Sequence, residues 1–170
     1  MGMEFEIEGI TVAQCQKILK NPMLIDEWFF VQEDSNEPLK PIKHEWICLG
    51  RSWHGIHFLI NQDGDTDMVN PPGSYAVFGK HLIEAEYLGV TCKYLLPEEA
   101  REVFHFISKF TKKDLSAIFN PQLMNQMGIY PRRTWTDGEF DSLYEVFEEL
   151  VNFYRVVSKK KKCTLNIFFY

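Results

Sequence analysis

The sequence predicts one α+β domain over residues 1–170: a mixed β-sheet with N- and C-terminal strands, packed by several helices. Residues 3–8 alternate between apolar side chains and glutamate, which is the period-two pattern of a half-buried strand. At the other end, residues 163–169 form a short apolar run typical of a strand. Residues 140–157 keep the 3.6-residue apolar period of a long C-terminal amphipathic helix. Terminal strands are held only when they are paired, so we expect both to join the sheet.

The composition fits a single globular domain with its own core. The chain has 170 residues, of which 45% are hydrophobic and 25% charged. A chain of this size buries about 70% of its unfolded surface when it folds. A disordered tail, a collagen-like repeat and a small stapled secreted module are therefore excluded.

Local signals place the elements of the first half. Thr11 and Gln14 form a capping box at the start of one helix, and Asn21-Pro22 begins a second, short one that ends at Phe29. The proline-containing stretch 32–43 is expected to be a loop. Residues 46–49 predict a strand, 53–60 a helix and 61–73 a loop, followed by strand candidates at 75–78 and 91–95.

The second half is expected to be helical up to the last strand. Pro97 starts a helix before Glu98 and Glu99, although Leu96 is a poor N-cap. Further helices are expected after the box of Thr111 with Asp114, after Asn120-Pro121, and after the box of Thr136 with Glu139. Four lysines, 159–162, follow the longest helix, where cations complement the carbonyl end of the helix dipole.

The charge balance disfavours a general nucleic-acid binder. The net charge is −6, and outside the run 159–162 fourteen basic residues face twenty-four acidic ones. A surface of that sign repels a phosphate backbone and favours solubility or a partner protein with a basic surface. Neither a signal peptide nor an apolar run of membrane-spanning length is recognisable.

The cysteine spacing fits neither a zinc site nor a disulfide framework, because the four cysteines include no Cys-x-x-Cys pair. We expect reduced thiols that pack as small hydrophobes and a protein located in the cytoplasm.

The strongest candidate for chemistry is the segment Trp53-His54-Gly55-Ile56-His57. Two histidines at i and i+3 converge if both face a cleft, whereas the alternative is one packed imidazole and one solvated imidazole. His57 shares a helical face with Trp53 and Ile60, so we expect it to be packed, and His54 lies at the edge of that face, closer to any cleft.

Three partial motifs are incomplete, and we assign no catalytic residue, no metal ligand and no cofactor. His44-Glu45-x-x-Cys48 lacks the second histidine of a zinc protease. The glycine spacing at 73–79 and His81 do not fit a phosphate-binding loop. The aspartates at 63–67 lack the glycine and glutamate of a calcium loop.

Several blocks of the sequence together resemble the bacterial YfbM-like proteins, a family of unknown function. The blocks are Trp53-His54-Gly55-Ile56-His57-Phe58-Leu59, Tyr94-Leu95-x-Pro97-Glu98-Glu99, Phe119-x-Pro121, Gly128-Ile129-Tyr130-Pro131, Trp135 and Phe147-Glu148-Glu149-Leu150-x-x-Phe153-Tyr154. They run in family order along almost the whole chain. The resemblance implies a single-domain bacterial α+β protein and brings no established catalytic set.

Two functional hypotheses remain open. The first is a non-enzymatic protein-binding module, for example an immunity-type protein that masks a basic active site of a toxin, because the surface is acidic and no catalytic set is complete. The second is a small-molecule-binding protein or enzyme that uses a pocket of histidines and aromatic rings. The candidate binding residues are His54, His57, Trp53, Tyr75, Tyr94 and Tyr130.

Overall fold

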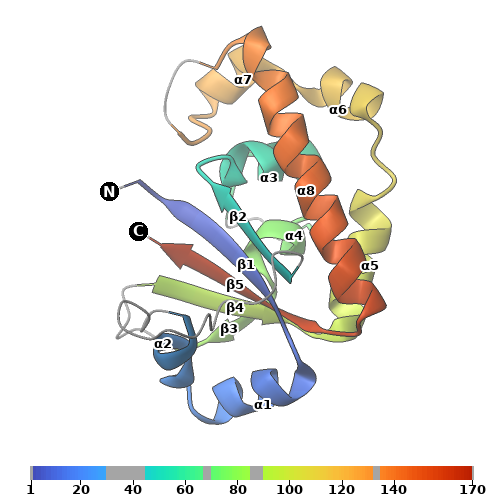
Figure 1. The fold of residues 1–170 in the computed structure, drawn as a ribbon. Coiled ribbons are helices and arrows are strands. Elements are labelled where there is room, and N and C mark those ends of the chain that lie inside the picture. Colours follow the sequence, from blue (N-terminus) through green and yellow to red (C-terminus); the bar gives the residue numbers. More distant parts are fainter. Residues whose placement is uncertain (1, 30–44, 67–69, 85–89, 132–134, 170) are drawn as a thin grey trace, which may run out of the picture.

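A computed structural model describes residues 2–29, 45–66, 70–84, 90–131 and 135–169 of the chain (Figure 1). Along the described residues the strands are β1 (Glu4–Ile10), β2 (Trp46–Gly50), β3 (His81–Ile83), β4 (Val90–Leu95) and β5 (Cys163–Phe169). The helices are α1 (Val12–Lys20), α2 (Leu24–Phe29), α3 (Trp53–Asn61), α4 (Tyr75–Phe78), α5 (Pro97–Ile107), α6 (Lys112–Ile118), α7 (Pro121–Gln126), the 3₁₀ turn η3 (Asp137–Glu139) and α8 (Phe140–Lys159).

The five strands form one sheet in the order β2-β1-β5-β4-β3. The α+β class and the terminal strands are confirmed, and Glu4 pairs with Phe169, so the two chain ends lie side by side (Figure 1). All four described pairings are antiparallel, which corrects the expected mixed sheet. Hydrophobic alternation looks the same for either strand direction, so the sequence pattern carried no information on direction.

The alternation along each strand divides the core into two layers. On one face, residues such as Phe5, Ile7 and Leu95 pack against α3, α4, α5 and α8 in the larger apolar cluster. On the other face, Cys92, Leu165 and Ile167 join apolar residues of α1 and α2 in the smaller cluster. Figure 1 shows α1 and α2 below the sheet and α5 and α8 beside it.

The long helix α8 is amphipathic as predicted. The 3₁₀ turn η3 leads directly into the helix, and the Glu139 carboxylate accepts from the backbone N–H of Thr136 at 2.8 Å. The buried side chains recur three or four positions apart, so one stripe faces the core. They are Leu143, Phe147, Leu150, Phe153, Tyr154 and Val157.

Part of the lysine run has a structural partner that the sequence pattern did not indicate. Lys160 and Lys162 both form ion pairs with Glu45, which lies just before β2 and is buried. Burial alone would raise the pKa of Glu45, but the hydrogen bonds and charges of the two lysines outweigh it and lower that pKa. The pairs fasten the end of α8 to the start of β2.

The helix α5 begins without a capping side chain at Leu96. The Glu99 carboxylate accepts from the backbone N–H of Leu96 at 2.8 Å, and Pro97 has no N–H that needs a partner. The same carboxylate binds Lys80 at 2.6 Å and His81 at 2.9 Å, so one glutamate joins the helix start to β3.

Residues 75–78 form the helical turn α4, which corrects the predicted strand. Side chains from distant elements satisfy two of its carbonyl groups: Tyr154 donates to Ala76 at 2.9 Å, and Asn166 donates to Val77 at 2.8 Å. At Gly79, a Cβ would lie 3.0 Å from the Cβ of Lys93, so a glycine there allows the chain to cross the sheet closely. These contacts outweigh the strand propensity of Tyr-Ala-Val-Phe. The short strand β3, at 81–83, had not been expected.

The helix α3 is more deeply buried than its apolar stripe predicted. Every residue from Trp53 to Ile60 is buried, because α4, α6 and α8 contact the helix and Trp53 packs against Phe5 of β1. Gly55 allows the contact with α8, since a Cβ there would lie 3.0 Å from Trp135 and 3.1 Å from Leu143.

The expectation for the cysteines is confirmed in part, and one predicted loop is not tested. The four cysteines form no disulfide, and Cys15, Cys92 and Cys163 are buried as expected, whereas Cys48 is exposed. The loop predicted at 32–43 lies outside the described residues. Within the described part of the chain, no helix is long and apolar enough to cross a membrane.

Candidate ligand cavity

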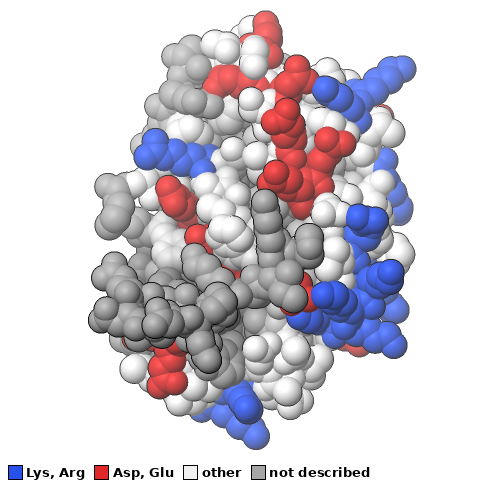
Figure 2. Space-filling model, viewed as in Figure 1, with Lys and Arg blue, Asp and Glu red and all other residues white. Residues whose placement is uncertain are grey.

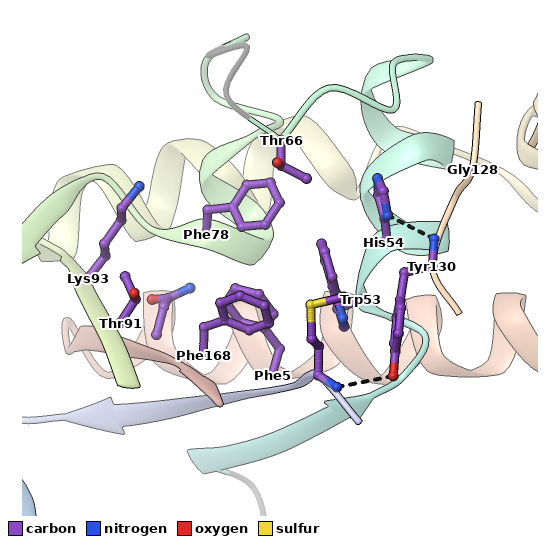
Figure 3. A pocket seen from close by; sticks show the side chains of 12 residues that line it. Phe5, Trp53, His54, Thr66, Phe78, Thr91, Lys93, Gly128, Tyr130 and Phe168 are labelled. Carbon is purple, nitrogen blue, oxygen red and sulfur yellow. Dashed lines mark hydrogen bonds between the residues drawn. The ribbon is translucent and has the colours of Figure 1, made fainter. Parts of the chain in front are cut away.

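A cavity of about 380 Å³ opens at the end of the sheet that carries both chain termini (Figure 3). Its volume lies in the range of small-molecule sites. Strands β1, β4 and β5 form its floor, α3 and α4 form its walls, and Thr66 and the segment 128–130 form its rim.

The floor consists of two neighbouring rows of the sheet. In the first row, Thr91 pairs with Phe168, and Phe168 pairs with Phe5. In the second row, Lys93 pairs with Asn166. Alternate residues of a strand point to the same face, so positions 91 and 93 of β4, together with 166 and 168 of β5, all face the cavity.

Aromatic rings make up most of the apolar lining. Phe5 and Phe168 are stacked with ring centroids 4.5 Å apart and an angle of 14° between their planes. Trp53 stacks on Tyr130 at 5.8 Å and 22°, and meets Phe78 edge-on at 5.9 Å. These are the arrangements that aromatic quadrupoles favour, so the rings hold one another in place around the cavity.

His54 fastens two separate segments of the rim. Its Nδ1 accepts from the backbone N–H of Tyr130 at 2.9 Å, shown as a dashed line in Figure 3, and its Nε2 lies 2.9 Å from the carbonyl oxygen of Gly64. Because a carbonyl only accepts and a backbone N–H only donates, the ring is neutral with its proton on Nε2. Burial lowers the pKa of His54, opposed by the bond to Gly64, which agrees with a neutral ring.

His57 lies behind His54 and packs rather than lining the cavity. It is 1% exposed, its ring centroid is 4.7 Å from that of Phe78, and its Nδ1 is 3.1 Å from Nδ2 of Asn61. Burial, followed by the neighbouring His54, lowers the pKa of His57 to about 4, against the opposing influence of the Asp65 backbone and the Asp63 and Asp65 carboxylates. The ring is therefore neutral at physiological pH.

The three predicted tyrosines lie in three different places. Tyr130 lines the cavity, and its hydroxyl accepts from the backbone N–H of Met3 at 3.1 Å. Tyr75 lies under the ammonium group of Lys80, 5.7 Å from its ring centroid. Tyr94 points to the opposite face of the sheet, where its ring is 4.9 Å from that of His81. Of the six predicted residues, the structure brings Trp53, His54 and Tyr130 to the cavity, and ligand binding by any of the six stays a prediction.

Sequence reasoning missed the residues of the floor. Lys93 is the cation among the described lining residues, and it lies on β4. The two positions of β4 that face the cavity, Thr91 and Lys93, are less apolar than the positions on the other face of that strand. That inverted alternation and the polar Asn166 within an apolar strand were the available signals. Neither signal indicated which strands lie next to each other in the sheet.

Asn166 is already engaged in the protein. Its side-chain amide donates to the carbonyl of Val77, and its oxygen accepts from the hydroxyl of Thr164 at 2.7 Å. We therefore assign it to positioning α4 over the floor rather than to binding a ligand.

A larger hollow, of about 590 Å³, lies between Arg51, Pro131 and Glu139. Its lining combines opposite charges with few rings, so it offers less apolar surface to an organic ligand than the aromatic cavity. Among the described residues, no group of three or more His, Cys, Asp and Glu side chains is placed to hold a metal ion.

The fold has a solved relative. The chain is similar to the crystal structure of YfbM from Escherichia coli, a protein of unknown function, with a TM-score of 0.75 and 18% sequence identity, over 97% of this chain and 99% of that one. At this identity the likeness concerns the fold. No curated protein matches the sequence. The model of the DUF1877 family, a domain of unknown function, matches residues 1–167, and the chain therefore belongs to the DUF1877 family.

Proposed function

We propose that this protein binds a small organic molecule in the cavity between α3, α4 and the sheet. The observation that carries the proposal is the combination of an aromatic lining with the ammonium group of Lys93 in a cavity of about 380 Å³. Apolar walls with a few polar groups that fix orientation are typical of ligand sites.

The state of His54 favours binding over acid-base catalysis. Both of its ring nitrogens are engaged with backbone groups of the rim, so neither is available to take a proton from a substrate. The ring instead holds the rim in shape, which is a positioning role.

A variant that fills the cavity tests the proposal. Thr91→Phe places a ring on the floor, whereas Leu82→Phe adds the same ring on β3 at an exposed position and serves as the matched control. We would screen small organic acids, amines and neutral aromatic compounds by the shift in unfolding temperature and confirm hits by calorimetry. Compounds that bind the native protein and Leu82→Phe but not Thr91→Phe support the proposal. If every hit still binds Thr91→Phe, or no compound binds, the cavity is not a ligand site.

A second function, docking of a protein with a basic surface, rests on the outer face of α8. Four acidic side chains, Asp141, Glu145, Glu148 and Glu149, recur there at helical spacing and are exposed. Figure 2 shows acidic side chains gathered over the upper part of this helix. Lys112 pairs with Asp141 at 2.6 Å and offsets part of the charge. An immunity-type protein that masks a basic toxin site would use such a surface.

Charge reversal tests this second function. We would pull down partners from a bacterial lysate with the native protein and with Glu145→Lys/Glu149→Lys, at low and moderate salt, with Glu98→Lys/Glu102→Lys on α5 as the matched control. A stoichiometric basic partner that is lost only with the α8 variant supports docking on α8. Capture that is equal for all three proteins, or no stoichiometric partner, contradicts it.

A further inference from the structure

We infer that the ligand of the cavity is a flat aromatic carboxylate, oriented with its carboxylate at Lys93 and its ring among the aromatic side chains of the floor and walls. The inference rests on the proposed function and adds the chemical class and the orientation of the ligand.

The charge of the lining argues for a single negative charge. Lys93 is the one cation among the described lining residues, and none of those residues is an aspartate or glutamate. An ammonium group beside aromatic rings acts in surroundings of lower dielectric than water, where its attraction to an anion is stronger. One lysine balances one carboxylate, whereas a phosphate dianion is usually held by several donors or an arginine fork.

The register of the sheet places the anionic end at β4. Lys93 and Thr91 are both on β4 and face the cavity, two residues apart, so an ammonium group and a hydroxyl flank the same end. In Figure 3 the Lys93 side chain stands above the sheet on the same side as Phe78 and Thr66, with its nitrogen turned away from the floor. The indole of Trp53 and the phenol of Tyr130 lie at the opposite end.

The arrangement of the rings argues for a flat ligand. The stacked pair of Phe5 and Phe168 contributes to the floor, and the indole of Trp53 stands at one wall at 63° to the ring of Phe168. A flat aromatic ring can lie offset on one surface while it meets the other edge-on, and both contacts are favourable. A bulky saturated ring makes neither contact well. The aromatic rings therefore select for a flat ligand, and Lys93 selects for its negative charge.

Three probes of similar size separate charge from flatness. 2-Naphthoate is flat and anionic, 2-naphthamide is flat and neutral, and decahydro-2-naphthoate is anionic and not flat. We expect calorimetry to show 2-naphthoate binding about tenfold more tightly than each of the other two, the factor for one charge-assisted hydrogen bond or one good ring contact. Equal affinity for the acid and the amide overturns the inferred charge, and equal affinity for the two acids overturns the inferred flatness.

Variants at Lys93 assign the preference to this site. Lys93→Gln should remove the tenfold preference of the acid over the amide while amide binding changes less than threefold, and Lys93→Arg should retain the preference. Lys113→Gln, at an exposed position of α6, is the matched control and should behave as the native protein. A preference that survives in Lys93→Gln overturns the assignment. The unfolding temperature of each variant shows that the comparison is made between folded proteins.

The outcomes also separate this inference from the proposed function. If all three probes bind with equal affinity and all are lost in Thr91→Phe, the cavity is a ligand site and only the inferred ligand class is wrong. If none of the three probes binds while other compounds of the screen bind and are lost in Thr91→Phe, the inferred ligand class is wrong and the proposed function stands. If no compound of the screen binds, or if all binding survives in Thr91→Phe, the proposed function and the inference both fail.

Discussion

The backbone N–H of Tyr130 donates to Nδ1 of His54 at 2.9 Å, across 76 positions of the sequence. The other ring nitrogen of His54 holds the carbonyl of Gly64. One neutral imidazole therefore connects helix α3 to the two segments that border the cavity, and the shape of the rim depends on it.

Removal of this imidazole should destabilise the protein and loosen the cavity. His54→Ala leaves the N–H of Tyr130 and the carbonyl of Gly64 without partners and removes the ring that stacks on Trp53 at 4.7 Å. We expect a loss of about 2–3 kcal/mol in the free energy of unfolding, measured with urea. His105→Ala, at an exposed position of α5, is the control, with an expected change below about 0.5 kcal/mol. Equal losses for the two variants would mean that the hydrogen bonds of His54 to Tyr130 and Gly64 contribute nothing to stability.

Stability should fall as the pH is lowered through the range in which the unfolded chain protonates His57. The folded-state pKa of His57 is about 4, against 6.5 for the unperturbed side chain, so below pH 6.5 the unfolded chain binds the proton first. The contribution of the neutral His57 ring to the free energy of unfolding is complete above pH 6.5 and is lost progressively down to about pH 4. It is on the order of 3 kcal/mol. Urea unfolding of the native protein and His57→Gln at intervals from pH 7 to pH 4 measures it. The stability difference between them should shrink steadily with falling pH, and a constant difference would contradict the lowered pKa.

Glu45→Gln should destabilise the junction of α8 and β2. Glu45 is buried and holds Lys160 and Lys162, and Lys162 has only 17% of its side chain exposed. Loss of the carboxylate leaves two positive charges without their partner, and we expect a cost of about 1–3 kcal/mol at pH 7 by urea unfolding.

The matched control for Glu45 is Asp141→Asn, which removes one carboxylate from an exposed ion pair with Lys112. Its expected cost is below about 0.5 kcal/mol. Because the pKa of Glu45 is lowered, its contribution is present above its unperturbed value of 4.5 and is lost as the pH falls through the lower folded-state pKa. A cost for Glu45→Gln no larger than that for Asp141→Asn would show that the junction does not depend on these ion pairs.

Leu96→Thr should stabilise the protein. Leu96 already has N-cap geometry, with φ −73° and ψ 161°, and it is 41% exposed, but its side chain cannot accept a hydrogen bond. A threonine hydroxyl could accept from the backbone N–H of Glu99, and we expect a gain of about 0.5–1 kcal/mol in the free energy of unfolding. Leu96→Val has a similar shape without the hydroxyl and should show no gain. A gain of the same size in both variants would assign the effect to lost leucine exposure instead of capping.

The elements that the sequence predicted correctly are those with local signals. The boxes at Thr11 and Thr111 begin α1 and α6, because a side chain and a backbone N–H three residues apart meet without help from the rest of the chain. The strand from Cys163 and the apolar stripe of α8 are also present, since both patterns follow from the period of their own element.

The wrong predictions concern segments whose structure depends on contacts with residues far away in the sequence. The segment 75–78 is helical because Tyr154 and Asn166, about 80 to 90 positions later, satisfy its carbonyl groups. The burial of α3 on all sides likewise depends on which elements surround it. No local pattern contains either contact.

By itself the sequence determined the secondary structure of most of the chain, the α+β class and the burial of Trp53 and His57. These properties follow from periodicity, capping and the side chains that each element must bury. Only the tertiary structure decided that β5 lies between β1 and β4, which brings Phe5, Phe168 and Lys93 to one cavity floor. Strand order and direction depend on long-range pairing, which alternation cannot encode, and the candidate ligand site is a product of that pairing.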